Sequence, residues 1–266
     1  MKKICFLLTF IYVFHSCRDE EKKTDPQLSS DKKVIAEWTE KINARKDSLQ
    51  LKKQFVEVLD SLKMYDKAIE QIDSLIFKDK LNSDLWLRKA QLHENNRDTP
   101  EAIRSYEKSI EIYPTVENQL NLANLFAESK NVKAFALCKN VSNMGLGRET
   151  DANCNFIAGI YFARTGNSNK AIELFDKAIN DNYILMEAYM EKGFIFFESK
   201  NFSKAIATFE TAIKINNQYA DAYYWKAKCD EALKNKEEAI LNYQRAFGLD
   251  KQMKEAKLAI ERLDGN

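Results

Sequence analysis

Large and small apolar side chains recur along this chain at a fixed spacing, while the residues between them are mostly charged or polar. In two segments 34 residues apart, Ala205 pairs with Ala239, Ile206 with Ile240, Phe209 with Tyr243 and Ala212 with Ala246. Apolar residues three or four apart lie on one face of a helix, so both segments predict amphipathic helices. Because size is kept while identity changes, these positions indicate close packing between helices.

The same spacing extends through most of the chain. Six alanines align along the chain, mostly at intervals of 34 residues. The exception is one unit with a shortened turn and an insertion near "SNMGLGRET". Across that unit, 69 residues cover two repeats plus one residue. Each aligned alanine follows an earlier small or modest side chain, so each unit predicts two antiparallel helices that cross where both side chains are small. The alanines are Ala68, Ala102, Ala134, Ala171, Ala205 and Ala239, and the earlier residues are Val56, Ala90, Ala123, Gly159, Gly193 and Ala227.

One unit shows the pattern most fully. It reads "SDLWLRKAQLHENNRDTPEAIRSYEKSIEIYP", with Trp86, Ala90, Ala102, Tyr106, Ser109 and Pro114 at the recurring places. These places resemble those of the tetratricopeptide repeat, and the resemblance extends from about Leu49 to Met253. It implies an all-α, right-handed solenoid of about six helix pairs, because one pair buries its apolar face only against its neighbours. The implied units are 49–82, 83–115, 116–151, 152–185, 186–219 and 220–253.

Apolar stripes flank the repeats at both ends. Val34, Ile35, Trp38 and Ile42 predict an N-terminal capping helix within residues 31–48, either separate from the first repeat or continuous with it, since no Gly or Pro intervenes. Met253, Ala256, Ile260 and Leu263 predict a C-terminal capping helix within residues 254–266. A solenoid needs such caps because its terminal units would otherwise expose an apolar face.

The composition agrees with an all-helical protein. Of 266 residues 45% are hydrophobic, and only seven are Gly and three are Pro, which is too few for the many turns of a β-rich fold. The formal net charge is +1, so no charge bias favours nucleic acid as the partner.

The first residues resemble a bacterial lipoprotein signal peptide. Lys2 and Lys3 precede the apolar run "ICFLLTFIYVF", which is too short to span a membrane. The run ends in "FHSC", which resembles a lipobox and implies that residues 1–16 are removed and that Cys17 carries the lipid. The alternative is an ordinary secretory signal with a chance Cys. Residues 17–30 are charged and nearly free of large apolar groups, which predicts a disordered tether.

The resemblance to lipoproteins also implies a location. Arg18 stands where an Asp would retain some lipoproteins in the inner membrane, so we expect an anchor in the outer membrane of a Gram-negative bacterium. Which side of that membrane the chain faces stays open, as does O-glycosylation at three "DSL" sequences, at 47–49, 60–62 and 73–75.

Candidate chemistry is sparse in the rest of the chain. Cys138, Cys154 and Cys229 lie in helical patterns and are expected to be buried thiols, with a Cys138–Cys154 disulfide left open. His93 is expected in the core or at a groove edge. No Cys/His cluster has metal-ligand spacing and no acid pair has a catalytic setting, so we expect no metal, no cofactor and no enzymatic activity.

The family resemblance implies that the first helix of each unit lines a concave groove. In the first two units the groove positions are polar and mostly acidic: Gln50, Lys53, Glu57, Asp60, Asp84, Gln91, Glu94 and Asn95. In the last three they are Phe156, Ile160, Met190, Phe194, Phe197 and Tyr224, with Arg164, Glu198 and Lys228 at the rim. We expect a hydrophobic peptide or helix to bind this second half. The alternatives are that the solenoid's own curvature covers these side chains, or that they form a self-association face.

Two functions follow as expectations. The first is a lipid-anchored adaptor that binds a protein or peptide in its groove and helps to assemble an envelope complex, as the layout of lipobox, tether and repeats is similar to that of tetratricopeptide-repeat lipoproteins. The second is a structural spacer in a secretion, pilus or motility machine, which would make its contacts on convex faces and caps.

Overall fold

A computed structural model describes residues 26–45 and 48–265 of the chain. Within these ranges the backbone forms fourteen helices and no strand, and none of those helices is both long and apolar enough to cross a bilayer. The predicted signal peptide and Cys17 lie outside the described residues. The helices are α1 (Pro26–Ala44), α2 (Leu49–Ser61), α3 (Tyr65–Lys78), α4 (Ser83–Asn95), α5 (Thr99–Ile112), α6 (Val116–Glu128), α7 (Lys133–Ser142), α8 (Arg148–Arg164), α9 (Ser168–Asp181), α10 (Met186–Glu198), α11 (Phe202–Ile215), α12 (Ala220–Ala232), α13 (Lys236–Leu249) and α14 (Lys254–Asp264).

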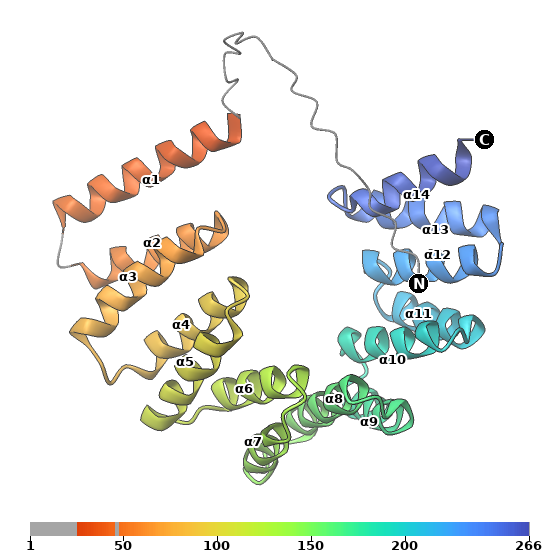
Figure 1. Cartoon of the computed structure of the whole chain (residues 1–266), viewed down its shortest axis with the longest axis horizontal. Helices are drawn as coiled ribbons and strands as arrows, with labels where there is room; N and C mark the ends of the chain where they lie inside the picture. Colours follow the sequence, from red (N-terminus) through yellow and green to blue (C-terminus); the bar gives the residue numbers. More distant parts are fainter. Residues whose placement is uncertain (1–25, 46–47, 266) are drawn as a thin grey trace, which may run out of the picture.

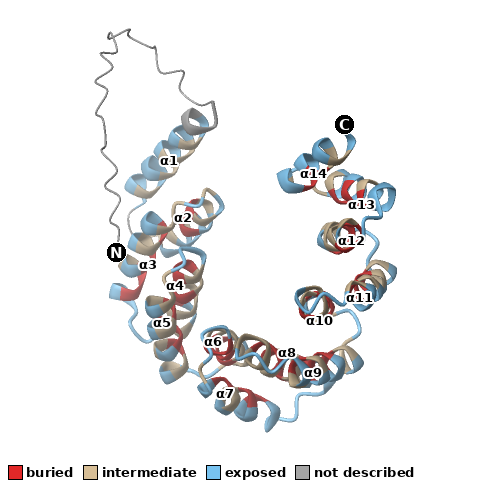
Figure 2. Ribbon diagram, turned by 45° about the vertical axis from the view of Figure 1, so that its right-hand side comes forward, coloured by how far each residue is buried: buried red, intermediate tan, exposed pale blue. Residues whose placement is uncertain are grey.

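The helices follow one another around a crescent (Figure 1). In Figure 2, α2, α4, α6 and α10 lie on the inner side of the curve, and α3, α5, α7 and α11 lie on the outer side. Helices α1 and α14 stand at the two ends (Figure 1). The predicted all-α solenoid is confirmed, and its inner face is built from the first helix of each pair.

The paired helices cross at the small residues that the sequence pattern picks out. Ala205 and Ala239 are fully buried at these crossings. A Cβ atom added to Gly193 would lie 2.3 Å from Cε1 of Phe209, and one added to Gly159 would lie 2.5 Å from Cε1 of Phe175. Size is therefore constrained at the crossing because a ring from the second helix occupies the space that a side chain would need.

The ring and the small residue vary together. Gly159 and Gly193 are paired with Phe rings, whereas Ala90 and Ala227 are paired with the rings of Tyr106 and Tyr243. The third unit, with Ala123, has Cys138 at the ring position. Both tyrosine hydroxyls donate hydrogen bonds to a glutamate on the partner helix, four residues after the Ala. Ala, the larger of the two small residues, is thus paired with a Tyr ring whose hydroxyl is held by a hydrogen bond.

The turn inside each unit uses a left-handed backbone conformation. Gly166 has φ of +85° there, which glycine adopts without strain. The other five turns place a basic side chain at the same position, with φ between 57° and 65°. These residues are Lys63, Arg97, Lys130, Lys200 and Lys234.

The third unit departs from the others where the sequence predicted. The amide of Ala134 donates to the carbonyl of Asn131, three residues earlier, whereas that of Ala102 donates to Asp98, four residues earlier. One residue is therefore missing from the start of α7. The insertion forms the connection to α8, where Gly145 and Gly147 have positive φ. Helix α8 begins at Arg148, one turn before the predicted unit boundary at residue 152.

The N-terminal end differs from the expectations in two ways. Helix α1 ends at Ala44, and the Ser48 hydroxyl caps α2 by accepting from the amide of Leu51 at 3.3 Å, so the alternative of one continuous helix is wrong. Helix α1 also begins at Pro26, so residues 26–30 of the predicted disordered tether are helical. Proline suits the first helical turn because its missing amide hydrogen has no partner there. The ring of Trp38 stacks on Phe55 of α2 at 6.1 Å.

The C-terminal end is closed by α14. Ala256 is fully buried against α13, and Ile260 and Leu263 pack on the same apolar cluster. Neighbouring units are also joined by a repeated ion pair, in which a lysine one residue before the small residue contacts an acid on the preceding outer helix. The pairs are Lys89–Asp73 at 2.7 Å, Lys192–Asp176 at 2.5 Å and Lys226–Glu210 at 3.1 Å.

Candidate partner-binding groove

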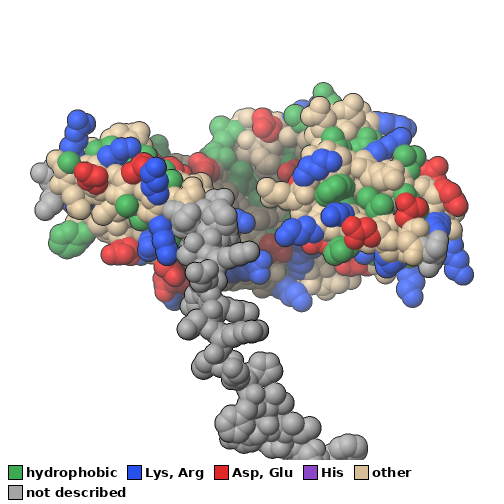
Figure 3. Space-filling view, turned by 90° about the horizontal axis from the view of Figure 1, so that it is seen from above, with side chains coloured by type: hydrophobic (Ala, Val, Ile, Leu, Met, Phe, Trp, Pro, Cys, Tyr) green, Lys and Arg blue, Asp and Glu red, His purple; other side chains and the backbone are tan. Residues whose placement is uncertain are grey.

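Three adjoining hollows lie along the C-terminal half of the solenoid. They have volumes of about 470, 540 and 540 Å³, which is the size range of ligand sites. Phe194 and Trp225 border the first and second, and Phe197 borders the second and third. Seen from the open side of the crescent, hydrophobic side chains are visible in the hollow between the two arms (Figure 3). The three hollows together form one groove, and its aromatic wall consists of Phe194, Phe197 and Trp225.

The first hollow, named the acidic hollow, is bordered by α6, α8, α10 and α12. Its floor is apolar, with Ile160 and Met190 at the bottom, and four carboxylates surround it. Arg164 binds two of these carboxylates, those of Glu128 and Glu191, at 2.7 and 2.9 Å. Its lining is Asn124, Glu128, Phe156, Ile160, Glu187, Met190, Glu191, Phe194, Tyr219, Asp221 and Trp225.

The second hollow, named the linking hollow, continues along α10. Here the aromatic side chains line the hollow together with Arg164 and Glu198, the rim residues predicted for this stretch. The lining is Ala163, Arg164, Ser168, Glu191, Phe194, Ile195, Phe197, Glu198 and Trp225.

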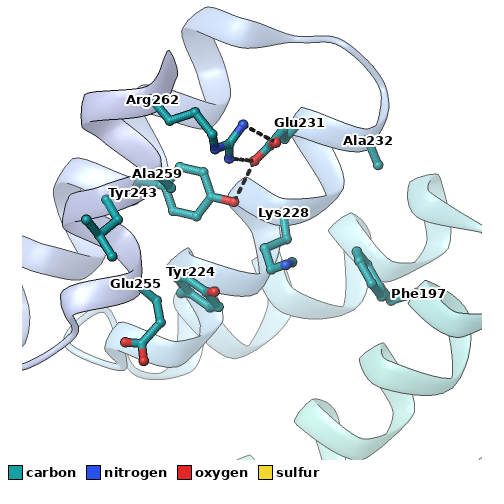
Figure 4. Close-up of a pocket in the computed structure, with 10 residues that line it drawn as sticks. Phe197, Tyr224, Lys228, Glu231, Ala232, Tyr243, Glu255, Ala259 and Arg262 are labelled. Carbon is teal, nitrogen blue, oxygen red and sulfur yellow. Dashed lines mark hydrogen bonds and ion pairs between the residues drawn. The ribbon is translucent and has the colours of Figure 1, made fainter. Parts of the chain in front are cut away.

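The third hollow, named the end hollow, lies beside the capping helix α14. Figure 4 shows Lys228 between Tyr224 and Phe197 in this hollow. Glu231 accepts hydrogen bonds from the hydroxyl of Tyr243 at 3.0 Å and from Arg262 at 2.9 Å (Figure 4). The hydrogen bond from Arg262 lowers the pKa of Glu231 against the opposing effect of burial. The hollow is lined by Phe197, Tyr224, Lys228, Glu231, Ala232, Tyr243, Glu255, Leu258, Ala259 and Arg262.

Trp225 is the centre of the aromatic wall, and the sequence pattern did not identify it. Its ring lies 4.7 Å from Phe194, 5.3 Å from Phe197 and 5.8 Å from Tyr224, measured between centroids. The signal was present in the run of three aromatic residues that ends at Trp225. Its contacts, however, reach back to the preceding unit, and a pattern within one helix does not reveal such contacts.

All eight side chains predicted to bind the partner line one of the three hollows. Six of them are partly exposed: Phe156, Arg164, Phe194, Phe197, Tyr224 and Lys228. Ile160 and Met190 also line the groove but are only 1% and 4% exposed, so for these two the alternative that the solenoid itself covers them holds. They support the floor, because the next unit packs over them.

Most of the acidic groove positions of the first two units accept hydrogen bonds from side chains of the same two units. Arg88 donates to Glu57 at 2.6 Å and to Asp60 at 2.7 Å, and Asn95 donates to the second oxygen of Asp60 at 3.0 Å. Glu94 accepts from the hydroxyl of Tyr106, and burial nevertheless raises the pKa of Glu94. This wall of the groove therefore satisfies much of its charge internally.

The remaining predicted chemistry is buried. Cys138, Cys154 and Cys229 are free thiols, and the Sγ of Cys154 donates to the carbonyl of Cys138 at 3.4 Å, so the structure contains no Cys138–Cys154 disulfide. Burial raises the pKa of Cys229 to about 12. His93 is 7% exposed, with Nδ1 at 3.5 Å from the carboxylate of Asp98. These groups belong to the core and not to the groove.

Comparison with known sequence families identifies the repeat. A model described as "TPR repeat" matches residues 193–228, and two models described as "Tetratricopeptide repeat" match residues 59–117 and 220–253. The chain is a tetratricopeptide-repeat protein. No curated protein matches the sequence.

Solved structures show the same fold. A tetratricopeptide repeat protein from Parabacteroides merdae is 16% identical with a TM-score of 0.67, and the match covers 90% of this chain and 100% of that one. PilW, whose title describes it as a widely conserved type IV pilus biogenesis factor, is 17% identical with a TM-score of 0.59, covering 74% and 91%. Yeast Tom70 is 16% identical with a TM-score of 0.59, covering 89% of this chain and 58% of Tom70. The TM-scores show a common fold, and at these low identities they show the fold alone.

Proposed function

We propose that this chain is an adaptor that is held at the bacterial outer membrane through lipid on Cys17 and that binds a segment of a partner protein in the groove formed by α8, α10 and α12. The repeats make it a scaffold for protein–protein interaction. The single observation that supports this groove is the partly exposed wall of Phe194, Phe197 and Trp225 along three adjoining hollows. Apolar surface of that kind is typical of interaction sites.

Photo-crosslinking tests the binding surface. The photoreactive residue p-benzoylphenylalanine would replace Phe156 in the groove and, as the control, Phe77 at the end of α3, which is 78% exposed outside it. In cells that express the full chain, we expect a discrete crosslinked partner from position 156 and none from position 77. Crosslinks from position 77 without any from position 156 would refute the proposal.

A spacer role is the second candidate. It is favoured by the exposed apolar side chains of Phe77 and Leu81, which are 78% and 77% exposed at the connection between α3 and α4. A spacer would use such outer positions and leave the groove empty. The same pair of crosslinking positions therefore separates the two functions.

The anchor is tested by Cys17→Ala. We expect the variant to move to the soluble fraction or to keep its signal peptide, because lipid on the cysteine is the proposed attachment. A variant that stays with the membrane after its signal peptide has been removed would contradict lipid anchoring. Because Cys17 lies outside the repeats, partner binding by the repeats can be measured independently of membrane attachment.

A further inference from the structure

We infer that the partner segment places a Lys or Arg side chain in the acidic hollow, next to apolar side chains that pack on the aromatic wall. This inference rests on the proposed function, since it specifies what occupies the same groove.

The first support is the charge around the acidic hollow. Of its four carboxylates, those of Glu128 and Glu191 are bound by Arg164. The carboxylates of Glu187 and Asp221 form no hydrogen bond or ion pair with any residue in ranges 26–45 and 48–265, and both residues are exposed. The hollow therefore presents two carboxylates without a cation, and a positively charged side chain would complement them.

The second support is where these two carboxylates lie. Glu187 is in the first turn of α10 and Asp221 is in the first turn of α12, where each is favoured by its own helix dipole. The helix dipoles explain why each position is acidic, but they do not require both carboxylates to border the same hollow. Both carboxylates line the same hollow as Tyr219, whose pKa is raised by burial and then by the charges of Asp221 and Glu187. The two carboxylates thus share this hollow with an aromatic side chain.

The third support is the aromatic lining of the same hollow. Phe156, Phe194 and Trp225 offer partly exposed rings. Lys and Arg place an aliphatic stem on apolar surface while their charged end stays with polar groups, and a cation is also attracted to an aromatic face. A hollow lined by both carboxylates and rings suits that combination better than it suits a neutral or an acidic side chain.

The end hollow provides an internal contrast. Its two cations, Lys228 and Arg262, share the hollow with the carboxylates of Glu231 and Glu255, and Arg262 is bound to Glu231 at 2.8 Å. That mixture gives no preference for one sign of charge. The selectivity is therefore localised in the acidic hollow, and the remainder of the groove contributes apolar contact.

A selection experiment tests this chemistry. The full-length chain, purified in detergent, would select binders from a phage-displayed library of random 12-residue peptides. The benzophenone variant at position 156 would then show which peptides occupy the groove. We expect the groove peptides to be enriched in Lys or Arg beside apolar residues. Peptides that crosslink at position 156 without such enrichment, or that are enriched in acidic residues, would overturn this inference and leave the proposed function standing. If no selected peptide crosslinks there, both fail.

Charge reversal then tests the two carboxylates directly. For the selected peptides, Glu187→Lys with Asp221→Lys should weaken binding about tenfold or more, measured by fluorescence anisotropy, because two attractive charges become repulsive. The control is Glu237→Lys with Glu238→Lys, which also removes two exposed first-turn acids but on the outer helix α13. The control should change the Kd by less than about twofold. Equal effects of both double variants would refute the assignment of the site to the acidic hollow.

Discussion

The junction between the first two units and the junction between the last two use the same three positions with opposite chemistry. On the later inner helix of each junction, the residue two positions before the small residue contacts two residues of the preceding inner helix. Those two residues lie one and four positions after the small residue of the preceding inner helix. In the N-terminal arm these positions hold Arg88 with Glu57 and Asp60. In the C-terminal arm they hold Trp225 with Phe194 and Phe197.

The comparison shows which features the fold requires and which it leaves free. A solenoid junction forms with ion pairs at 2.6 and 2.7 Å in one arm and with rings at 4.7 and 5.3 Å in the other. Aromatic side chains are therefore not a condition for stacking the units. In the N-terminal arm the charges satisfy each other, whereas the C-terminal arm leaves part of its apolar surface exposed and available for a partner.

The largest expected effect comes from removing the central side chain of each junction. Trp225→Ala should lower the free energy of unfolding by about 2–3 kcal/mol, less than the roughly 3–5 kcal/mol of a fully buried ring because Trp225 is partly exposed. Arg88→Ala should cost about 1 kcal/mol or less, since ion pairs near the surface contribute little. Urea denaturation of both variants measures the difference.

Salt sharpens the same comparison. High salt should reduce the effect of Arg88→Ala because exposed charges are screened, and it should leave the effect of Trp225→Ala in place. If Arg88→Ala proved as costly as Trp225→Ala and as insensitive to salt, the two junctions would not differ as we describe.

A smaller effect is expected at the helix crossings. Gly193→Ala should destabilise the fold by about 1–2 kcal/mol, because the new Cβ forces the ring of Phe209 to move and this outweighs the better helix propensity of Ala. The reverse change at the equivalent position, Ala227→Gly, should cost about 1 kcal/mol through helix propensity and lost packing. Thermal denaturation of both variants provides the check, and a stabilised Gly193→Ala would contradict the packing of the ring on the glycine.

The turns give a somewhat smaller effect, whose sign differs between two equivalent positions. Lys200 has φ of 59°, so Lys200→Gly should raise stability by about 0.5–1 kcal/mol by relieving the left-handed conformation. Gly166 occupies the equivalent turn with φ of 85°, and Gly166→Ala should lower stability by about 1 kcal/mol. Changes of the same sign in the two variants would argue against this turn geometry.

The smallest expected effect concerns pH. Burial raises the pKa of Glu94 above 4.5, so its contribution to stability is lost as pH rises through that raised pKa. The hydrogen bond from Arg262 lowers the pKa of Glu231 below 4.5, so its contribution is lost as pH falls. Urea midpoints measured from acidic to neutral pH provide the check. The wild-type chain should lose stability toward neutral pH through Glu94, and Glu94→Gln should not show this loss. It should also lose stability toward acidic pH through Glu231, and Glu231→Gln should not show that loss. Arg262→Gln should weaken the acid-side effect of Glu231.

The sequence predicts the crossings better than the surface of the groove. Ala205 and Ala239 could be identified because size recurs at fixed offsets, and both are fully buried. Ile160 and Met190 could not be placed, because their exposure depends on how closely the next unit packs over them. The role of Trp225 depends on contacts with residues 28 and 31 positions earlier, at Phe197 and Phe194, which no period within a helix reports.

The N-terminal helix shows a second kind of limit. The charged stretch before residue 31 predicts disorder by composition, yet α1 begins at Pro26. Its helical state follows from the apolar residues Ile35, Trp38 and Ile42 further along the helix, which pack against the first unit. The composition of a short segment does not reveal that the rest of its helix packs against the first unit.

The central claim, that the aromatic arm and not the charged arm holds the partner, is tested most directly by crosslinking from the two equivalent positions. p-Benzoylphenylalanine would replace Trp225 in one full-length variant and Arg88 in the other, and both would be irradiated in cells. We predict a discrete crosslinked partner from position 225 and none from position 88. The same partner from position 88, with none from position 225, would contradict the claim.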